Sequence, residues 1–204
     1  MKTMKKAPIL LATRNPGKLK ELRPLFAAVG YPVTDLAEFQ LEADEGEAEV
    51  ESFDSFEANA LAKARYFYEI SGGVATVADD SGLEVPALGG APGVRSRRFS
   101  TAGTDVANNA KLLEAMKDVS DRSARFVCAA AFVGLGSEMV RLGATHGVIT
   151  GAPRGSGGFG YDPLFESVEL GKTFGEATLE EKARVSHRAR AFAALLAALQ
   201  AAQG

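Results

Sequence analysis

The chain has little cysteine, little histidine and no long apolar run. Each shortage excludes a class of protein or a kind of site. Its 204 residues include one cysteine, Cys128, which cannot form an internal disulfide, so we expect a reducing compartment. Because Cys128 lies within the apolar run ARFVCAAAFVGL, we interpret it as a small buried residue rather than a nucleophile. The two histidines, His146 and His187, lack the spacing of metal ligands, which argues against a zinc site.

Long hydrophobic segments and an excess of positive charge are also missing. No stretch of 18 apolar residues occurs, so we expect no transmembrane span. The apolar run after the first lysines has only about five residues, too short for a signal peptide, and we expect a cytoplasmic protein. The net charge is −3, whereas proteins that coat nucleic acid are usually basic. If the ligand is an anion, positive charge must be concentrated locally.

What is present indicates a globular α/β protein. Apolar residues make up 46% and charged residues 24%, and the length suits one large domain or two small lobes that share a core. Strand-like and helix-like segments alternate, and one pair of strands reads as a hairpin, which predicts a mixed sheet flanked by helices. The predicted strands are 8–12, 74–78, 124–135 and 138–149, and the predicted helices are 18–30, 54–71, 104–118 and one that follows Ser186.

Local signals set several of these boundaries. Gly30 is expected to end the first helix, although Pro24 weakens that prediction. Asp54 or Ser55 and Thr104 are expected helix caps. The sequence TLEE at 178–181 has the form of a capping box. The acidic run 41–51 and the glycine-rich segment 150–163 are interpreted as loops.

Three familiar motifs are tested and set aside. GSGGFG at 155–160 matches a dinucleotide-binding pattern, but it occurs late in the chain and no helix follows it. GKT at 171–173 lacks the first glycine of a P-loop, since Glu166 stands there. No G-x-S-x-G sequence indicates a serine hydrolase.

The loop from Thr13 to Lys18 precedes the first predicted helix. A glycine-containing loop at a helix N-terminus offers backbone N–H groups and the positive end of the helix dipole, and Lys18 adds a charge. The segment is therefore a candidate phosphate cradle. An ordinary loop with a solvated lysine is the alternative.

Charged and amide side chains also flank the second long helix. Glu51 precedes it and Lys63 lies within it, and both are either site residues or solvated surface charges. Asn59 is a mediocre helix former, so we expect it to hold a loop through hydrogen bonds.

Two adjacent aspartates, Asp79 and Asp80, follow the predicted strand 74–78, and Ser81 and Gly82 come next. Successive side chains at a strand end point to opposite faces, so one aspartate can face a ligand while the other fixes the turn. Carboxylate oxygens suit Mg²⁺ at a site for phosphate chemistry. A capped turn without function is the alternative.

A fourth polar group combines an aromatic glycine loop with a later helix start. An aromatic ring in such a loop can stack on a base, and side-chain donors at a helix start can read it. Without the other segments, a packed aromatic loop beside a helix cap would be favoured. The residues are Phe159, Gly160, Tyr161, Asp162, Lys182, Ser186, His187 and Arg188.

Taken together, the segments LATRNPGKLKEL, ADDSGLEV, ALGGAPGV, GGFGYDP, EEK and SHR resemble, in order and over nearly the whole chain, the inosine triphosphatase family. The resemblance implies an elongated mixed sheet of two lobes around a central cleft, within one pyrophosphatase domain spanning 1–204. It also implies a homodimer; the net charge and the lack of a long apolar run lead us to expect no nucleic-acid or membrane partner. The implied activity is Mg²⁺-dependent hydrolysis of ITP, dITP and XTP to the monophosphate and pyrophosphate, which cleanses the nucleotide pool.

The resemblance also implies roles for individual residues. Asp80 corresponds to the catalytic acid, and Glu51 together with Asp80 to the metal ligands. The implied substrate contacts are Thr13, Asn15, Lys18, Lys63, Ser81, Phe159, Gly160, Tyr161, Asp162, Lys182, His187 and Arg188. The chain departs from the family at three positions: Ala58 replaces a frequent glutamate, Pro86 a frequent aspartate and Arg95 a frequent tyrosine. Loss of the carboxylate at Ala58 could weaken a contact to the residues that hold the metal.

Two rival functions are considered. A purine-nucleotide sensor without catalysis would keep the lysines and the aromatic residue but would not need paired acids. An RNA-binding module would use Arg95, Arg97 and Arg98, although a solvated basic loop explains them more simply.

Overall fold

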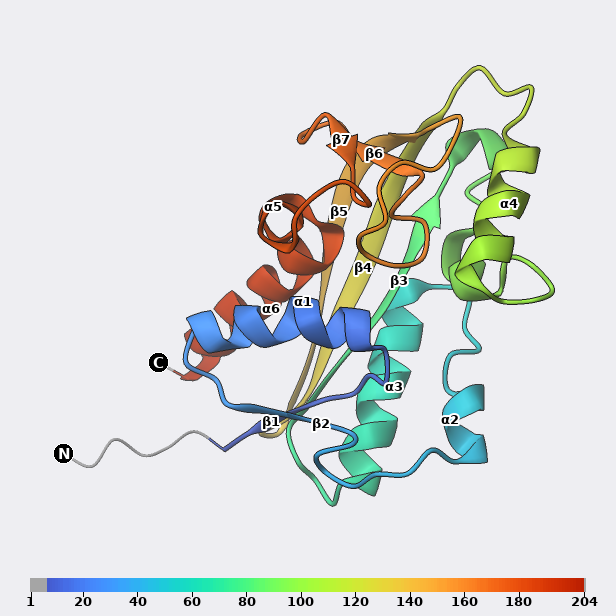
Figure 1. Cartoon of the computed structure of the whole chain (residues 1–204). Helices are drawn as coiled ribbons and strands as arrows, with labels where there is room; N and C mark the ends of the chain where they lie inside the picture. The colour runs from blue at the N-terminus through green and yellow to red at the C-terminus, as the bar shows by residue number, and fades with distance from the viewer. Residues whose placement is uncertain (1–6, 204) are drawn as a thin grey trace. The chain divides into compact units, whose positions relative to one another are not determined.

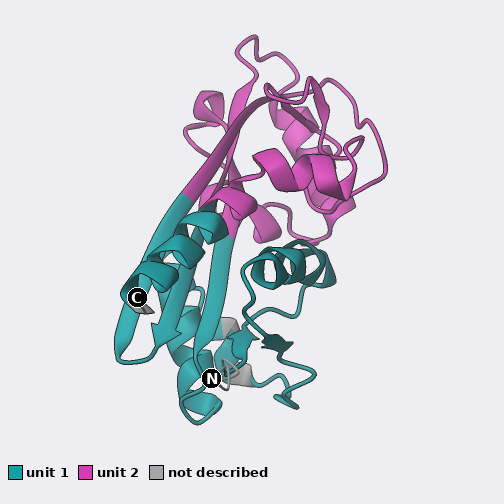
Figure 2. Ribbon diagram, turned by 90° about the vertical axis from the view of Figure 1, so that its left-hand side faces the viewer, with its two compact units in different colours: residues 1–80, 129–142, 191–204 teal, residues 81–128, 143–190 magenta. Residues whose placement is uncertain are grey.

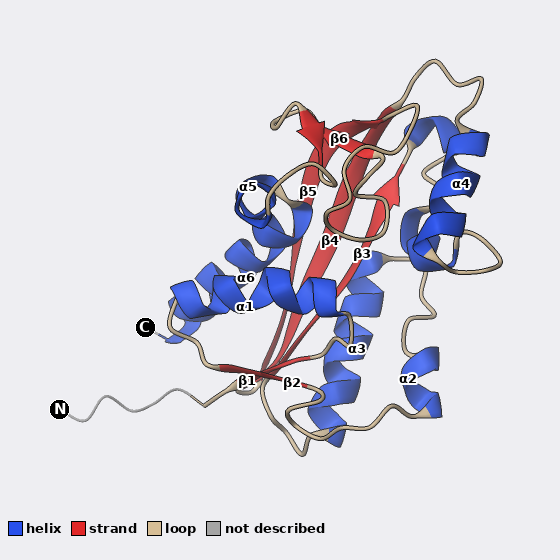
Figure 3. Ribbon diagram, viewed as in Figure 1, coloured by secondary structure: helices blue, strands red, loops and turns tan. Residues whose placement is uncertain are grey.

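The structure is a computed structural model that describes residues 7–203, and it contains one mixed β-sheet with flanking helices (Figures 1 and 3). This confirms the predicted α/β class. The strands are β1 (Ile9–Leu11), β2 (Val33–Asp35), β3 (Thr76–Glu84), β4 (Ser123–Gly134), β5 (Ser137–Ile149), β6 (Phe165–Ser167) and β7 (Lys172–Thr173). The α-helices are α1 (Pro16–Ala28), α2 (Glu45–Glu49), α3 (Phe56–Ile70), α4 (Asp105–Ala115), α5 (Leu179–Val185) and α6 (His187–Gln203), and 3-10 helices span Pro86–Leu88 and Gly93–Arg98.

The strands lie side by side in the order β2-β1-β3-β4-β5-β6-β7. Strand β1 runs parallel to both of its neighbours, with Leu10 opposite Thr34 and Thr76, whereas β5, β6 and β7 are paired antiparallel. The neighbours β4 and β5 are joined by Leu135 and Gly136, both of which have positive φ, as a two-residue type I′ hairpin turn requires. The predicted hairpin is therefore confirmed.

The chain divides into two compact units, drawn in different colours in Figure 2. Unit 1 consists of residues 1–80, 129–142 and 191–204, and unit 2 of residues 81–128 and 143–190. The boundaries fall within β3, β4, β5 and α6, so each unit contains part of these elements. The first boundary lies between Asp80 and Ser81.

Each unit has its own apolar core. In unit 1, Phe26 of α1 meets Phe192 of α6 edge-on, with ring centroids 5.9 Å apart, and α3 buries Phe56, Ala60, Ala64 and Phe67, as its spacing predicts. In unit 2, the core around Phe126, Phe165 and Phe174 includes buried residues from β3, α4 and the glycine-rich loop. No helix among the described residues has the length and apolar character to cross a membrane.

Helix boundaries follow local chemistry closely. Asn15, Ser55, Thr104 and Thr178 each cap a helix with a side-chain oxygen, and the capping box of Thr178 and Glu181 is complete. Helix α1 continues through Pro24, because burial of Leu22 and Phe26 on one face outweighs the lost backbone hydrogen bond. Gly30, with φ of 70°, follows the helix end as predicted.

Two predictions need correction. Strand β3 does not end before the paired aspartates but continues through them to Glu84, so no turn lies at Asp79. The acidic run is not all loop, because Asp44 caps the short helix α2. The short strands β2, β6 and β7 were not predicted, since two or three residues carry no readable period.

Candidate active site

The loop before α1 is held in shape by its own side chains. The backbone N–H of Asn15 donates to Oγ1 of Thr13 at 3.2 Å, and Oδ1 of Asn15 accepts from the N–H groups of Gly17 and Lys18 at 2.8 and 3.2 Å. Sequence reasoning expected free N–H groups at this helix end; two of them are instead bonded to the cap. The loop keeps the positive end of the helix dipole and the charge of Lys18.

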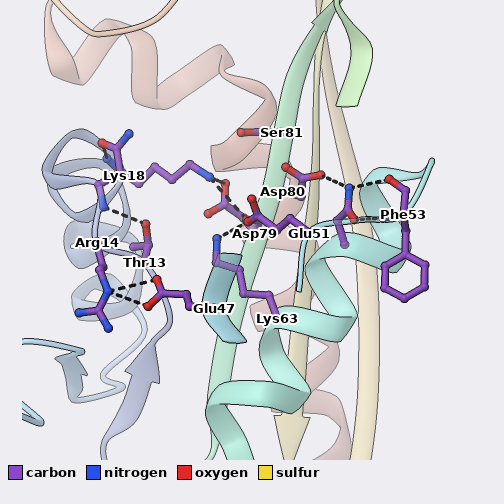
Figure 4. A network of polar contacts seen from close by, with 12 residues as sticks. Thr13, Arg14, Lys18, Glu47, Glu51, Phe53, Lys63, Asp79, Asp80 and Ser81 are labelled. Carbon is purple, nitrogen blue, oxygen red and sulfur yellow. Dashed lines mark hydrogen bonds and ion pairs between the residues drawn. The ribbon is translucent and has the colours of Figure 1, made fainter. Parts of the chain in front are cut away.

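Lys18 and Asp79 form an ion pair in unit 1. Nζ of Lys18 lies 3.0 Å from Oδ2 of Asp79, whose side chain is fully buried, and Figure 4 shows the lysine reaching across to it. The prediction that one of the two aspartates fixes a turn was therefore wrong, because Asp79 lies inside a strand and binds this lysine.

Lys63 and Glu51 form a second ion pair. Nζ of Lys63 donates to Oε1 of Glu51 at 2.5 Å (Figure 4). Burial alone would raise the pKa of Glu51, but the charge and hydrogen bond of Lys63 outweigh burial and hold that pKa below its usual value. Burial acts to lower the pKa of Lys63, but the charges of Glu51 and Asp79 raise it above the ordinary lysine value. The pair therefore stays ionised and is not a pair of solvated surface charges.

Asn59 connects the third acid to the loop before α3. It is only 2% exposed, and its Nδ2 donates to Oδ2 of Asp80 at 2.9 Å and to the carbonyl of Phe53 at 3.1 Å. Its Oδ1 accepts the N–H of Phe53 at 2.9 Å. The expectation that Asn59 pins a loop is confirmed, and the same amide also orients the Asp80 carboxylate.

The carboxyl group of Asp80 has a raised pKa. Burial raises its pKa, the hydrogen bond from Asn59 and the charge of Lys18 lower it, and the negative charges of Glu51 and Asp79 raise it, so the pKa settles at about 6. A buried carboxyl group whose pKa is raised by burial and by neighbouring acids is a candidate functional group.

We call Lys18, Glu51, Lys63, Asp79 and Asp80 the unit 1 cluster. Further hydrogen bonds, which the sequence did not indicate, hold the segment that precedes Glu51. Nε of Arg14 donates to both carboxylate oxygens of Glu47, and its NH1 donates to the carbonyl of Leu41. The hydroxyl of Tyr66 donates to Asp44, the cap of α2. These contacts hold the acidic segment that leads to Glu51, and no local pattern in the sequence indicates them.

The donor set of unit 1 suits a hard divalent cation. Glu51, Asp79 and Asp80 offer carboxylate oxygens, and Asp80 is destabilised as an anion by the other two acids. Among the described side chains, no group of three or more His, Cys, Asp and Glu residues is arranged to hold a metal ion. Mg²⁺ commonly takes one or two carboxylates and completes its shell with water and substrate phosphate, so the two predicted ligands Glu51 and Asp80 fit that ion.

Unit 2 holds the remaining predicted residues around a buried ion pair. Nζ of Lys182, 4% exposed, donates to Oδ2 of Asp162 at 2.6 Å, and the same oxygen accepts the N–H of Phe159 at 2.8 Å. The Lys182 ammonium lies 4.9 Å from the centre of the Phe159 ring, and the Arg188 guanidinium lies 5.6 Å from it. The Phe159 ring thus lies close to two cations, and the residue is partly exposed.

Other predicted residues of unit 2 are fixed by the core. Tyr161 is buried and donates its hydroxyl to the carbonyl of Ser96 at 2.8 Å. The His187 ring stacks on Phe126 at 4.6 Å. NH2 of Arg188 donates to Oγ of Ser81 at 2.8 Å. Ser186 caps α6 as expected, since its Oγ accepts the N–H of Ala189.

The glycine-rich loop is shaped by close contacts. Gly158 has φ of 72°, and a Cβ there would lie 2.0 Å from Oδ2 of Asp162, so only glycine lets the carboxylate approach. Gly160 is bonded through both backbone groups to α4: its N–H donates to Asp105 at 2.7 Å, and its carbonyl accepts from Nδ2 of Asn109 at 3.0 Å. Sequence reasoning missed Asp105 and Asn109, because polar residues at the exposed start of a helix look like an ordinary solvated turn.

Within each unit the structure brings together residues that the sequence had grouped: paired acids and lysines in unit 1, and an aromatic residue among cations in unit 2. Lysines beside acids can bind phosphate groups and a metal ion, and an exposed aromatic ring can stack on a base. The family model described as the Ham1 family matches residues 9–198, so this chain belongs to the Ham1 family.

Named relatives and solved structures agree with this membership. A dITP/XTP pyrophosphatase of Thermus thermophilus is 47% identical over 193 residues, covering 93% of this chain and 90% of the relative. A crystal structure from Mycobacterium abscessus, titled nucleoside-triphosphatase / dITP/XTP pyrophosphatase, has 45% identity and a TM-score of 0.70, covering 93% of this chain and 99% of the other. A HAM1 protein structure from Coxiella burnetii has 35% identity and a TM-score of 0.83 over 96% and 99% of the two chains.

Proposed function

We propose that this protein is a nucleoside-triphosphate pyrophosphatase that hydrolyses dITP, XTP and ITP to the monophosphate and pyrophosphate. Family membership over nearly the whole chain and the names of its relatives support this assignment. The single structural observation that carries it is the unit 1 cluster, in which Lys18 and Lys63 balance Asp79 and Glu51 while Asn59 orients Asp80.

In this proposal the unit 1 residues handle the triphosphate. The charges of Lys18 and Lys63 attract phosphate oxygens, and the dipole of α1 adds to that attraction. Glu51 and Asp80 would hold Mg²⁺, which when bound supplies charge neutralisation at the phosphates. Asp80 orients a water molecule toward the α-phosphorus, a role its fixed carboxylate supports.

The proposed reaction is hydrolysis at the α-phosphorus. A bond forms between the water oxygen and the α-phosphorus, and the bond from that phosphorus to the bridging oxygen of the β-phosphate breaks. The bridging oxygen leaves with pyrophosphate, and the water proton passes to Asp80 or to solvent. Proximity and orientation, rather than strong basicity, carry the contribution of Asp80.

Base selection is assigned to the unit 2 residues. The Phe159 ring stacks on the purine, and Lys182, His187 and Arg188 supply hydrogen-bond donors. Hypoxanthine and xanthine present an acceptor at the six position, whereas adenine presents a donor. A buried donor left unpaired by the wrong base can discriminate by roughly 10⁴-fold.

We further propose that the protein acts in the cytoplasm as a homodimer of one two-lobed domain, without nucleic-acid or membrane partners. The family resemblance supports the two-lobed homodimer, and the single cysteine, the net charge of −3 and the lack of a long apolar run support the other points. Size-exclusion chromatography with light scattering checks the dimer, and a monomer at micromolar concentration would contradict it.

A panel of triphosphates tests the assigned activity. With Mg²⁺ present, we expect kcat/KM for dITP, XTP and ITP to exceed that for ATP and GTP by at least about 100-fold, because the six-position and two-position groups of the base are read. Comparable values for ATP would remove the proposed selectivity. Binding of ITP without any hydrolysis would favour a sensor instead.

A further inference from the structure

Two side chains in the first two turns of α4 form hydrogen bonds with one residue of the glycine-rich loop, Gly160. Asp105 and Asn109 are four positions apart, so their side chains lie on the same face of the helix. One accepts from the N–H of Gly160 and the other donates to its carbonyl, so both backbone groups of this glycine are bonded to a single helix.

This glycine lies between the two aromatic residues of the loop. Gly160 has φ of 62°, a left-handed conformation that favours glycine. Tyr161 goes into the core, whereas Phe159 is partly exposed beside the charges of Lys182 and Arg188. The position of the Phe159 ring therefore depends on how Gly160 is held.

The neighbouring helix residue holds a second segment around the same loop. Oδ1 of Asn108 accepts the N–H of Ser100 at 2.7 Å, and its Nδ2 donates to the carbonyl of Arg97 at 3.1 Å. The adjacent Ser96 carbonyl accepts the Tyr161 hydroxyl. Helix α4 thus fixes the loop directly through Gly160 and indirectly through the segment 96–100.

We propose that Asp105 and Asn109 are positioning residues for base recognition, which set the Phe159 ring through Gly160 before the nucleotide binds. This inference rests on the proposed function, because it takes Phe159 as the surface on which the purine stacks. A preorganised loop binds its ligand without the entropic cost of ordering, so the two contacts act on affinity for the base.

The test compares Asp105→Ala and Asn109→Asp with Asp105→Asn and Val106→Ala. Asn109→Asp keeps the side-chain shape but removes the donor to Gly160, and Asp105→Asn retains an acceptor oxygen. Val106 is 82% exposed on the same helix and serves as the matched control. Circular dichroism and thermal melting establish that each variant is folded.

For ITP we expect KM to rise roughly fivefold to tenfold in Asp105→Ala and Asn109→Asp, with kcat within about twofold of wild type, because only uniform binding is lost. Asp105→Asn and Val106→Ala should stay near wild type. Inhibition by tripolyphosphate, which has no base, should be unchanged in every variant, since the phosphates are assigned to unit 1.

An unchanged KM for ITP, or an equal loss of tripolyphosphate inhibition, would overturn the proposal, because the first shows no positioning and the second shows general damage. Hydrogen exchange of the Gly160 amide adds a readout that does not need catalysis, and we expect faster exchange in Asp105→Ala. If wild-type protein does not hydrolyse ITP, the proposed function fails. If the Gly160 amide exchanges at the same rate in Asp105→Ala as in wild type, the proposed role of Asp105 in holding Gly160 is refuted.

Discussion

Asp80 shows how the environment of one residue sets its chemistry. An isolated aspartate has a pKa of about 3.9 and is a weak base. Burial, together with the negative charges of Glu51 and Asp79, raises the pKa of Asp80 to about 6 despite Asn59 and Lys18. The amide of Asn59 also fixes one carboxylate oxygen, so this acid is both oriented and unusually ready to accept a proton.

We expect the Asp80 carboxyl to titrate near pH 6 in magnesium-free protein. Because the folded pKa is raised, protonation of Asp80 favours folding below its unfolded pKa, and that contribution is lost as pH rises through about 6. Carbon-13 NMR of the aspartate carboxyl signals measures the midpoint, and the spectrum of Asp80→Asn assigns the signal. A midpoint below about pH 4.5, close to the value of an unperturbed aspartate, would contradict the electrostatic description.

From the sequence, candidate site residues could be selected more easily than the contacts between them could be predicted. The acids, the lysines and the aromatic loop could be selected from the sequence because such residues are unusual in their local setting. The ion pair Lys18–Asp79 could not, since partners 61 positions apart are brought together only by the fold. The same holds for Arg14 with Glu47, 33 positions away. Glu51 and Lys63, in contrast, were grouped in the sequence without a predicted contact.

At the scale of elements, helix starts and the two strands of the hairpin could be predicted from the sequence, whereas the end of β3 could not. A cap is a local event, so Ser55, Thr104 and the capping box at Thr178 could be predicted from a few residues. The extent of β3 is set by its neighbours in the sheet, and pairing carries the strand through two aspartates that look like a terminus. The short strands β2, β6 and β7 are also defined by pairing with their neighbours, so the sequence alone does not indicate them.

Asn15 separates the structural and functional roles of one element, the N-terminus of α1. Asn15→Asp retains a good cap, whereas Asn15→Ala should lower the free energy of unfolding by about 1 kcal/mol. Both should raise KM for ITP, but for different reasons: the aspartate repels the triphosphate, and the alanine loosens the loop that presents Lys18.

Chemical denaturation and steady-state kinetics together check this pair. The stability of Asn15→Asp should match wild type even though its KM is higher. Equal KM values for wild type and Asn15→Asp would show that phosphates do not approach this helix end.

For the whole molecule, we propose that an acidic protein accommodates an anionic ligand because it gathers lysine and arginine side chains locally and because bound Mg²⁺ would add positive charge. The net charge is −3, yet Lys18 and Lys63 are concentrated among the acids of unit 1, and Lys182 and Arg188 around the aromatic loop of unit 2. The lysines are ion-paired, so each cluster is close to balanced before a ligand arrives. The α/β class followed from alternating elements, whereas the division into units within three strands and a helix did not.

The most direct test of the central claim is the identity of the product released from dITP with Mg²⁺, measured for wild type and Asp80→Asn. Wild-type protein should release pyrophosphate and dIMP in equal amounts, and chelation of the metal with EDTA should stop the reaction. Asp80→Asn should bind dITP with similar affinity but lose at least about 100-fold in kcat, the scale of a lost catalytic group. Release of orthophosphate by the wild type, or near wild-type turnover by Asp80→Asn, would contradict the account.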